Sequence, residues 1–287
     1  MSLPLLPVFA AWRQTLKAGY SFKALRGDLA AGLTVGIIAI PLAMALAIAV
    51  GVAPQYGLYT VLVAAPLIAL TGGSRFNVSG PTAAFVVILL PITQQFGLGG
   101  LLLCTMLAGL IMIAMGLGRA GRLIEFVPYP VTLGFTAGIG IVIATLQLKD
   151  LFGLSLSSQP LHYLEQVQVL LLALPSAHLG DALVAALSLA VLILWPRWVP
   201  KVPGHLAALA VGTLAGLALE ALGIPLATLG ERFSYSLDGV LHAGIPPFLP
   251  DFAWPWQLPA ANGQPLGLSF ELIRQLLAPA FAIAMLG

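Results

Sequence analysis

The sequence carries very little charge. Of its 287 residues, 8% are charged and 60% are apolar, and the mean hydropathy is +1.02. A soluble domain needs about 25% charged residues to cover its surface, so this composition excludes most soluble proteins and indicates a polytopic membrane protein. The net charge of +2, from 12 Lys and Arg against 10 Asp and Glu, is too small for a nucleic-acid-binding surface.

Cysteine, paired histidine and catalytic motifs are also scarce. The single cysteine, Cys104, excludes an internal disulfide framework and a cysteine-based structural zinc site. No two of the 4 histidines fall on one predicted helix face, so no metal site is expected. The sequence contains no P-loop, Gly-x-Ser-x-Gly or His-Glu-x-x-His pattern. It therefore predicts a protein that is not an enzyme and that needs no cofactor.

Long uncharged stretches predict the membrane spans, because about 20 apolar residues cross the hydrocarbon core as a helix. Two of these stretches are long enough for two spans each, and both are interrupted by residues that disfavour helix. The predicted spans lie at 29–50 and 56–70, then two within 76–118 separated at 94–97, then at 130–148, 182–195 and 203–222, with an eighth from about Gln275 that is unfinished at Gly287.

These spans organise the whole chain. The region after the seventh span is rich in proline, and its Trp254 and Trp256 are expected to anchor at the membrane interface. Residues 160–174 are predicted to form a short interfacial amphipathic helix. The expected parts are a cytoplasmic N-terminal segment at 1–28, an all-α seven-span membrane repeat at 29–222, an extracytoplasmic loop at 223–268 and the start of span eight at 269–287.

The positive residues predict the orientation. With the N-terminus in the cytoplasm, nine of the 12 Lys and Arg lie on the cytoplasmic side, and Lys149, Arg232 and Arg274 lie outside. The opposite orientation would invert this ratio. Because Lys and Arg are in excess on the cytoplasmic side of membrane proteins, the sequence predicts a cytoplasmic N-terminus.

The third predicted span begins with a break. Proline is favoured in the first turn of a helix, so a helix should begin at Pro81, after extended residues Ser74–Gly80. Non-helical backbone at membrane depth is stable only where it is buried in protein or lines a polar cavity. The free amides of Thr82, Ala83 and Ala84, at the positive end of the helix dipole, would attract an anion. Such discontinuous helices are typical of secondary transporters, and the alternative is a kink that binds no ligand.

Further breaks and small residues mark other helices. Pro41 lies inside the first predicted span, where a proline removes one helical hydrogen bond and bends or opens the helix. A kink that faced the start of the third-span helix would widen a cavity, whereas a simple packing kink is the alternative. Close helix packing is predicted at three Gly-xxx-Gly pairs, namely Gly32 and Gly36, Gly134 and Gly138, and Gly212 and Gly216.

Several motifs together resemble the sulfate permease (SulP) family of anion transporters. They are DLAAGLTVG at 28–36, IPLAMA at 40–45, PQYGLY at 54–59, TGGSR at 71–75, VSGPTA at 78–83 and GFTAG at 134–138. Leu42 stands where many relatives have glutamine after the proline. In this respect the sequence is similar to the bacterial branch of aerobic C4-dicarboxylate transporters.

The resemblance implies two inverted seven-span repeats, a substrate site between the N-termini of the third and tenth helices, and a cytoplasmic STAS domain. The chain would then be the N-terminal half, from a longer protein or a truncated product, and it would lack the second repeat, the STAS domain and an acidic residue of span eight. The residues expected to bind the substrate are Pro41, Leu42, Leu46, Ser79, Gly80, Pro81, Thr82, Ala83 and Ala84.

The expected function is secondary active transport of a small anion by alternating access in a bacterial inner membrane. Proton-coupled uptake of succinate, fumarate and aspartate is the first choice of substrate, and sulfate or bicarbonate is the second. A non-transporting or channel-like membrane subunit is the alternative of a different class. The expected partners are the anion, a coupling ion (H⁺ or Na⁺), the lipid bilayer, the C-terminal half of the same protein and a second copy in a homodimer.

Overall fold

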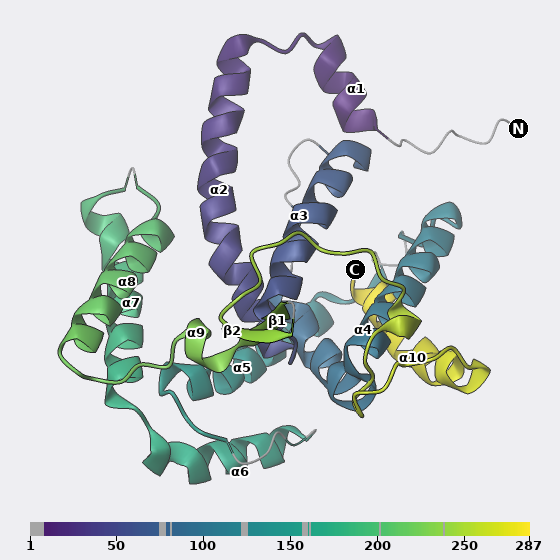
Figure 1. Cartoon of the computed structure of the whole chain (residues 1–287). Coiled ribbons are helices and arrows are strands. Elements are labelled where there is room, and N and C mark those ends of the chain that lie inside the picture. The colour runs from purple at the N-terminus through teal and green to yellow at the C-terminus, as the bar shows by residue number, and fades with distance from the viewer. Residues whose placement is uncertain are drawn as a thin grey trace, which may run out of the picture. The chain divides into compact units, whose positions relative to one another are not determined.

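The computed structural model describes residues 9–74, 79–80, 82–121, 126–156, 160, 162–200, 202–237 and 239–287. These residues are mostly helical (Figure 1). The helices are α1 (Ala10–Lys17), α2 (Phe22–Ala49), α3 (Pro54–Thr71), η1 (Ala83–Phe85), α4 (Val86–Leu117), α5 (Tyr129–Leu151), α6 (Tyr163–Ala173), η3 (Leu174–Ser176), α7 (Leu179–Trp198), α8 (Gly204–Ala221), α9 (Leu229–Arg232), η4 (Pro255–Gln257) and α10 (Phe270–Leu286), and the strands are β1 (Ser234–Leu237) and β2 (Val240–Ala243).

Six helical segments of the described residues are long and apolar enough to cross a membrane. The seven complete spans that the sequence predicts overlap these six segments, two of them within Ala83–Leu117, and their number stays a prediction. Within it, Gly97 has φ 68° and ψ −167°, which breaks α4 into two arms. The interruption predicted at 94–97 is therefore confirmed at its last residue.

One predicted helix start was wrong. The eighth span was expected from about Gln275, but α10 begins at Phe270, because the hydroxyl of Ser269 accepts a hydrogen bond from the Leu272 amide and caps the helix. Its first turns carry Glu271 and Arg274, and treating charges as span boundaries placed the helix start too late. The observed 17 residues make a helix about 25 Å long.

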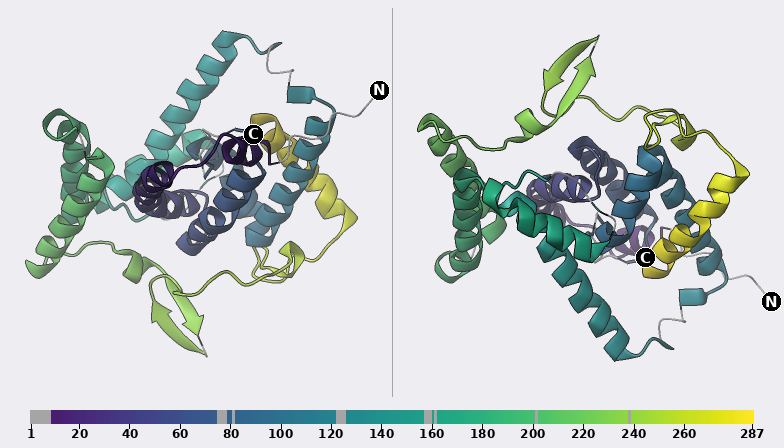
Figure 2. Two further views of the ribbon diagram at one scale, coloured as in Figure 1. Left: turned by 90° about the horizontal axis from the view of Figure 1, so that it is seen from above. Right: turned by 90° about the horizontal axis from the view of Figure 1, so that it is seen from below.

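The loop predicted at 223–268 contains a hairpin that an all-α description omits. Strands β1 and β2 pair antiparallel, with Leu237 opposite Val240, and Figure 2 shows them as a two-stranded ribbon. Gly239 in the turn has φ 78°, a conformation that glycine adopts without a steric cost. The Asp-Gly pair at 238–239 is a strong hairpin signal in sequence, although Asp238 itself lies outside the described residues.

The described chain divides into two compact units. The first comprises Met1–Ile48, Ala53–Pro81 and Ala186–Leu249, and the second comprises Ala49–Val52, Thr82–Ala185 and Pro250–Gly287. Helix α7 contributes its first turns to the second unit and the rest to the first.

Close contacts at glycines hold the first unit together. A Cβ at Gly57 of α3 would overlap the carbonyl oxygen of Ala43 in α2, so these two helices approach through the absence of a side chain. In α8, a Cβ at Gly212 would lie 2.5 Å from the Ser188 hydroxyl of α7, as the close packing predicted for this glycine requires. The Tyr59 hydroxyl of α3 donates to the Phe248 carbonyl at 3.1 Å and fastens the loop that follows the hairpin.

The first unit has an exposed polar contact next to the start of α2, on the side that the sequence predicts to be cytoplasmic. The Tyr20 hydroxyl, in the connection between α1 and α2, donates to the carboxylate of Asp28. This hydrogen bond, with the nearby negative charge, raises the pKa of Tyr20 above its usual range.

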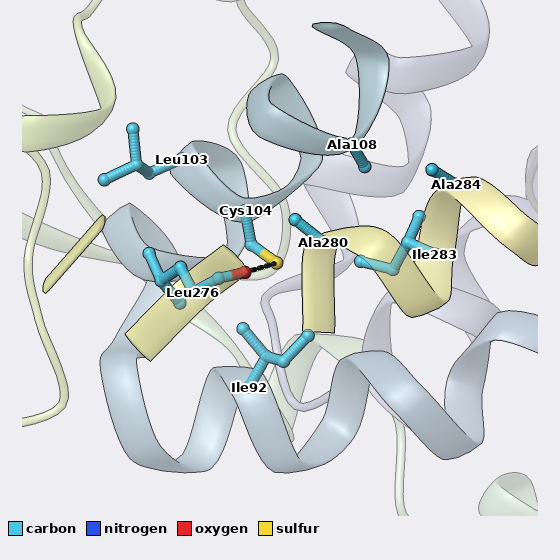
Figure 3. Close-up of a cluster of buried hydrophobic side chains, with 8 residues drawn as sticks. All are labelled: Ile92, Leu103, Cys104, Ala108, Leu276, Ala280, Ile283 and Ala284. Atoms are coloured by element: carbon cyan, nitrogen blue, oxygen red, sulfur yellow. Dashed lines mark hydrogen bonds between the residues drawn. The ribbon is translucent and has the colours of Figure 1, made fainter. Parts of the chain in front are cut away.

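The second unit has its core between α4 and α10, which lie side by side (Figures 1 and 2). Four residues of α10 at helical spacing, Leu276, Ala280, Ile283 and Ala284, are buried against both arms of α4. Figure 3 shows the side chains of this cluster, with Ile92 from the first arm and Leu103, Cys104 and Ala108 from the second.

Candidate functional site

The start of α4 is the centre of the site that the sequence predicts. Thr82 is extended, with φ −121° and ψ 140°, and the chain then enters the tight turn η1, in which the Phe85 amide donates to the Thr82 carbonyl at 3.3 Å. The helix therefore begins at Ala83 rather than at Pro81, because Thr82 keeps the extended backbone. Pro81 lies outside the described residues.

The first amides of this helix have no partner from helix geometry. In any helix the first N–H groups precede the first internal hydrogen bond, and here those groups belong to Ala83 and Ala84. The Thr82 side chain makes no capping hydrogen bond to the turn. Thr82 is exposed, and Ala83 and Ala84 are half-buried. The arrangement can therefore present backbone donors to a ligand of negative charge.

The extended segment before the helix is described only in part. The sequence predicts extended backbone at Ser74–Gly80, but residues 75–78 lie outside the described residues. Ser79 is half-buried and Gly80 is exposed. Arg75, which was expected near the cytoplasmic interface, also lies outside them.

The α2 residues of the predicted site are described in the first unit. Helix α2 is continuous through Pro41, so the proline does not open it. Leu42 is 50% exposed, whereas Leu46 is 7% exposed and lies with Ala43 and Ala47 on the buried face of α2. Because Thr82 belongs to the second unit, the assembly of these residues into one site stays a prediction.

Apolar packing holds the first turns of α4 in place. Val86, Leu90 and Ile92 of the first arm are buried, and η1 lies against α5. Gly51, with φ 84°, comes close to Leu90, since a Cβ there would lie 3.4 Å from Leu90 Cδ1. The amides of Ala83 and Ala84 therefore extend from a helix whose first turns are held by apolar contacts.

The described residues offer little other chemistry. They contain no group of three or more His, Cys, Asp or Glu that could hold a metal ion. Cys104 is fully buried, with its Sγ 3.8 Å from the Leu276 carbonyl oxygen of α10. It packs in the core shown in Figure 3 and takes no part in the predicted site.

Sequence reasoning missed the contact that closes the second unit. Residues 254–267 of the loop pack on Gly97 and Gly99 of α4. Three glycines within four residues, at 97–100, next to a predicted break were a usable signal of close backbone approach. The partner segment could not be named from sequence, because it lies more than 150 residues further along the chain.

Comparison with known proteins is consistent with this fold. Residues 25–287 match the sulfate permease family. The putative sulfate transporter YvdB of Bacillus subtilis is 36% identical over 269 residues, which are 94% of this chain and 47% of that protein. The bicarbonate transporter BicA of Picosynechococcus sp. is 30% identical over 203 residues, which are 67% of this chain and 36% of that protein. These relatives are named as transporters rather than enzymes, as the sequence predicts for this chain.

A solved structure is similar as well. It is the transmembrane domain of a cyanobacterium bicarbonate transporter BicA, with a TM-score of 0.70 and 27% identity, and the match covers 93% of this chain and 64% of that one. This likeness confirms the predicted polytopic membrane fold. The chain spans about half the length of the curated relatives it matches. From the match over residues 25–287 and the identity with these relatives, the chain belongs to the sulfate permease family.

Proposed function

We propose that the protein, at full length, is a secondary active transporter that moves a small anion across a membrane by alternating access. The observation that carries this proposal is the start of α4, where extended Thr82 leads into a helix whose first amides, at Ala83 and Ala84, are not used by the helix. Backbone donors at a broken helix bind an anion without a buried Lys or Arg, as in other secondary transporters. Pro41, Leu42 and the residues before Thr82 complete the proposed site.

The substrate class is the finer part of the proposal. The names of the relatives, sulfate and bicarbonate transporters, support an inorganic oxyanion. Proton-coupled C4-dicarboxylate uptake is supported only by Leu42, the residue after Pro41 that is similar to the C4-dicarboxylate branch. Amides at a helix start bind many anions alike, so competition among labelled sulfate, bicarbonate and succinate in proteoliposomes decides between them. An imposed proton or sodium gradient identifies the coupling ion in the same vesicles.

The experiment on the site replaces Ala83. We expect Ala83→Phe to abolish uptake by blocking the approach to the amides, with little change in the folded fraction. Ala114→Phe is the matched control, because Ala114 is an exposed alanine on the other arm of α4. Normal uptake by a well-folded Ala83→Phe protein would refute the site. Absence of uptake for every tested anion in the unmodified full-length protein would favour the non-transporting subunit.

The proposed orientation, with the N-terminus in the cytoplasm of a bacterium, rests on the distribution of Lys and Arg. In a protein with Cys104→Ala, we expect a cysteine at exposed Asn262 to react with an impermeant maleimide in spheroplasts. A cysteine at Val202, beside Lys201, should react only after lysis. The reverse pattern would overturn the orientation without affecting the site.

The proposal extends to two further partners, the C-terminal half and a second copy of the protein. We propose that a C-terminal half supplies the second repeat, because the chain covers 47% of its relative in Bacillus subtilis. Co-expression of that half should raise both the level of the chain in membranes and the uptake. Detergent size exclusion of the complete protein tests the proposed homodimer, and a monomer peak would contradict it.

A further inference from the structure

The break between the two arms of α4 is lined by backbone rather than by side chains. Gly97, Gly99 and Gly100 are all buried there, and we call them the glycine seat. Gly97 combines φ 68° with ψ −167°, a backbone region that is essentially restricted to glycine. The seat is therefore a place where another stretch of backbone can approach α4 closely.

Residues Trp254–Gly267, which we call the strap, occupy the glycine seat. The Gly99 amide donates to the Pro259 carbonyl at 3.1 Å. A Cβ at Gly99 would lie 2.7 Å from the Pro255 carbonyl oxygen, and one at Gly97 would lie 2.6 Å from the Ala261 nitrogen. Both distances are shorter than real Cβ contacts, so the strap fits only because these residues are glycines.

The strap is held together by its own backbone hydrogen bonds. Its Leu266 and Gly267 amides donate to the carbonyls of Leu258 and Trp256, both at 3.0 Å. Nearer the tip, the Ala260 amide donates to the Gln264 carbonyl at 2.8 Å. These hydrogen bonds join the two sides of the strap, so we expect the strap to move as one piece with its contact at the glycine seat.

The strap ends directly before α10. One residue, Leu268, separates it from Ser269, the residue whose hydroxyl caps the helix. The start of α10 is therefore held at a fixed distance from the break in α4.

The contact between α4 and α10 combines small and large side chains. Ala280 and Ala284 of α10 meet Ala108 and Cys104 of α4 (Figure 3). Small side chains let the two helices approach closely here, while Leu276 and Ile283 of α10 pack with Ile92 and Leu103 of α4 in the same cluster.

We propose that the strap in its glycine seat is a positioning clamp, which sets the axial position of α10 between the two arms of α4. The clamp adds a restraint through the backbone of the strap to the register that the side-chain packing of the two helices favours. Gly99 and Gly97 are its positioning residues, because they act through the strap.

The test uses the single native cysteine of this chain. Cys104 and Ala280 lie next to each other in the core (Figure 3), so Ala280→Cys creates a pair that an oxidant joins into a disulfide. Any other cysteines of the full-length protein are replaced by serine. A protease site is inserted after exposed Gly239, so that cleavage leaves Cys104 and the cysteine at position 280 on different fragments unless a disulfide joins them. A non-reducing gel after cleavage then measures the rate of cross-linking in membranes.

The first comparison is between two glycines of α4. We expect Gly99→Leu to displace the strap, because the added side chain overpacks the glycine seat. The displaced strap should shift α10 by part of a turn and slow the cross-linking about tenfold. Gly109→Leu is the matched control, because a Cβ at Gly109 meets nothing within 4 Å, and it should leave the rate unchanged.

A second comparison adds no atom to the seat, so it remains valid if Gly99→Leu fails to fold. Four glycines inserted between Gly267 and Leu268 separate the strap from α10 and should also slow the cross-linking. The same insertion between Asn262 and Gly263, at the exposed tip, should not. Equal rates for the two insertions would overturn the clamp. Because the readout is a covalent bond, it is independent of whether the protein transports.

Discussion

Helices α4 and α5 are neighbours in the second unit and are both strongly apolar, yet they are used differently. Helix α4 buries ten of its residues within the chain, whereas α5 buries none. The glycines of α5, Gly134, Gly138 and Gly140, have no described atom within 4 Å of a Cβ position, whereas Gly97 and Gly99 at the α4 break are crowded by the strap. Hydropathy therefore specifies which segments enter the membrane, and local room for backbone specifies which of them pack.

The same glycine-to-leucine substitution in the two helices should give the largest difference in stability. Gly97→Leu places a side chain against the Ala261 backbone at a glycine-only φ and ψ, which should cost about 4–6 kcal/mol from overpacking and backbone strain together. Gly138→Leu on α5 should cost little by the contacts of this chain. Thermal unfolding of both full-length variants in detergent measures the difference. Equal losses would show that the crowding at Gly97 is relieved by movement of the strap.

The next effect comes from the buried face of α10. Leu276 is 0% exposed and packs against Leu103 and Cys104, so Leu276→Ala should cost about 3 kcal/mol through lost contacts and a cavity. Leu133→Ala on α5, where the side chain is 55% exposed, should cost far less. The two midpoints of unfolding, measured side by side, should differ clearly. A large loss for Leu133→Ala would indicate that α5 packs on a surface outside this chain.

The comparison also explains what sequence could and could not predict. The spans, the break at Gly97 and the uncapped start near Thr82 follow from local rules about charge, glycine and helix ends. The start of α10 was missed because Glu271 and Arg274 lie inside the helix, where solvated charges are tolerated near its end. The strap was missed because its contact with Gly99 depends on a distant segment whose own turns had to be known first.

The predicted site shows the same division. Thr82, Ala83 and Ala84 have the extended-to-helix geometry that local rules required, shifted by two residues from Pro81. The part contributed by α2 was predicted at Pro41, which was expected to bend or open the helix; α2 remains helical through Pro41, and the role of these residues in the site stays a prediction. A proline within a long apolar helix loses one hydrogen bond but keeps the packing around it, here the buried face with Ala43.

The smallest expected effect concerns how the two helices begin. Helix α10 is capped by the Ser269 hydroxyl, which accepts from the Leu272 amide at 3.1 Å, whereas α5 follows Pro128 without a side-chain cap. Ser269→Ala should therefore destabilise the protein by about 1 kcal/mol, and Ser269→Asp should retain most of the stability because its carboxylate accepts the same bond and favours the helix N-terminus. The readout is the unfolding midpoint of three proteins, the unmodified chain and the two variants, at full length. If Ala and Asp gave the same midpoint, the start of α10 would be held by the strap alone, and the cap would contribute nothing to the difference between the two helices.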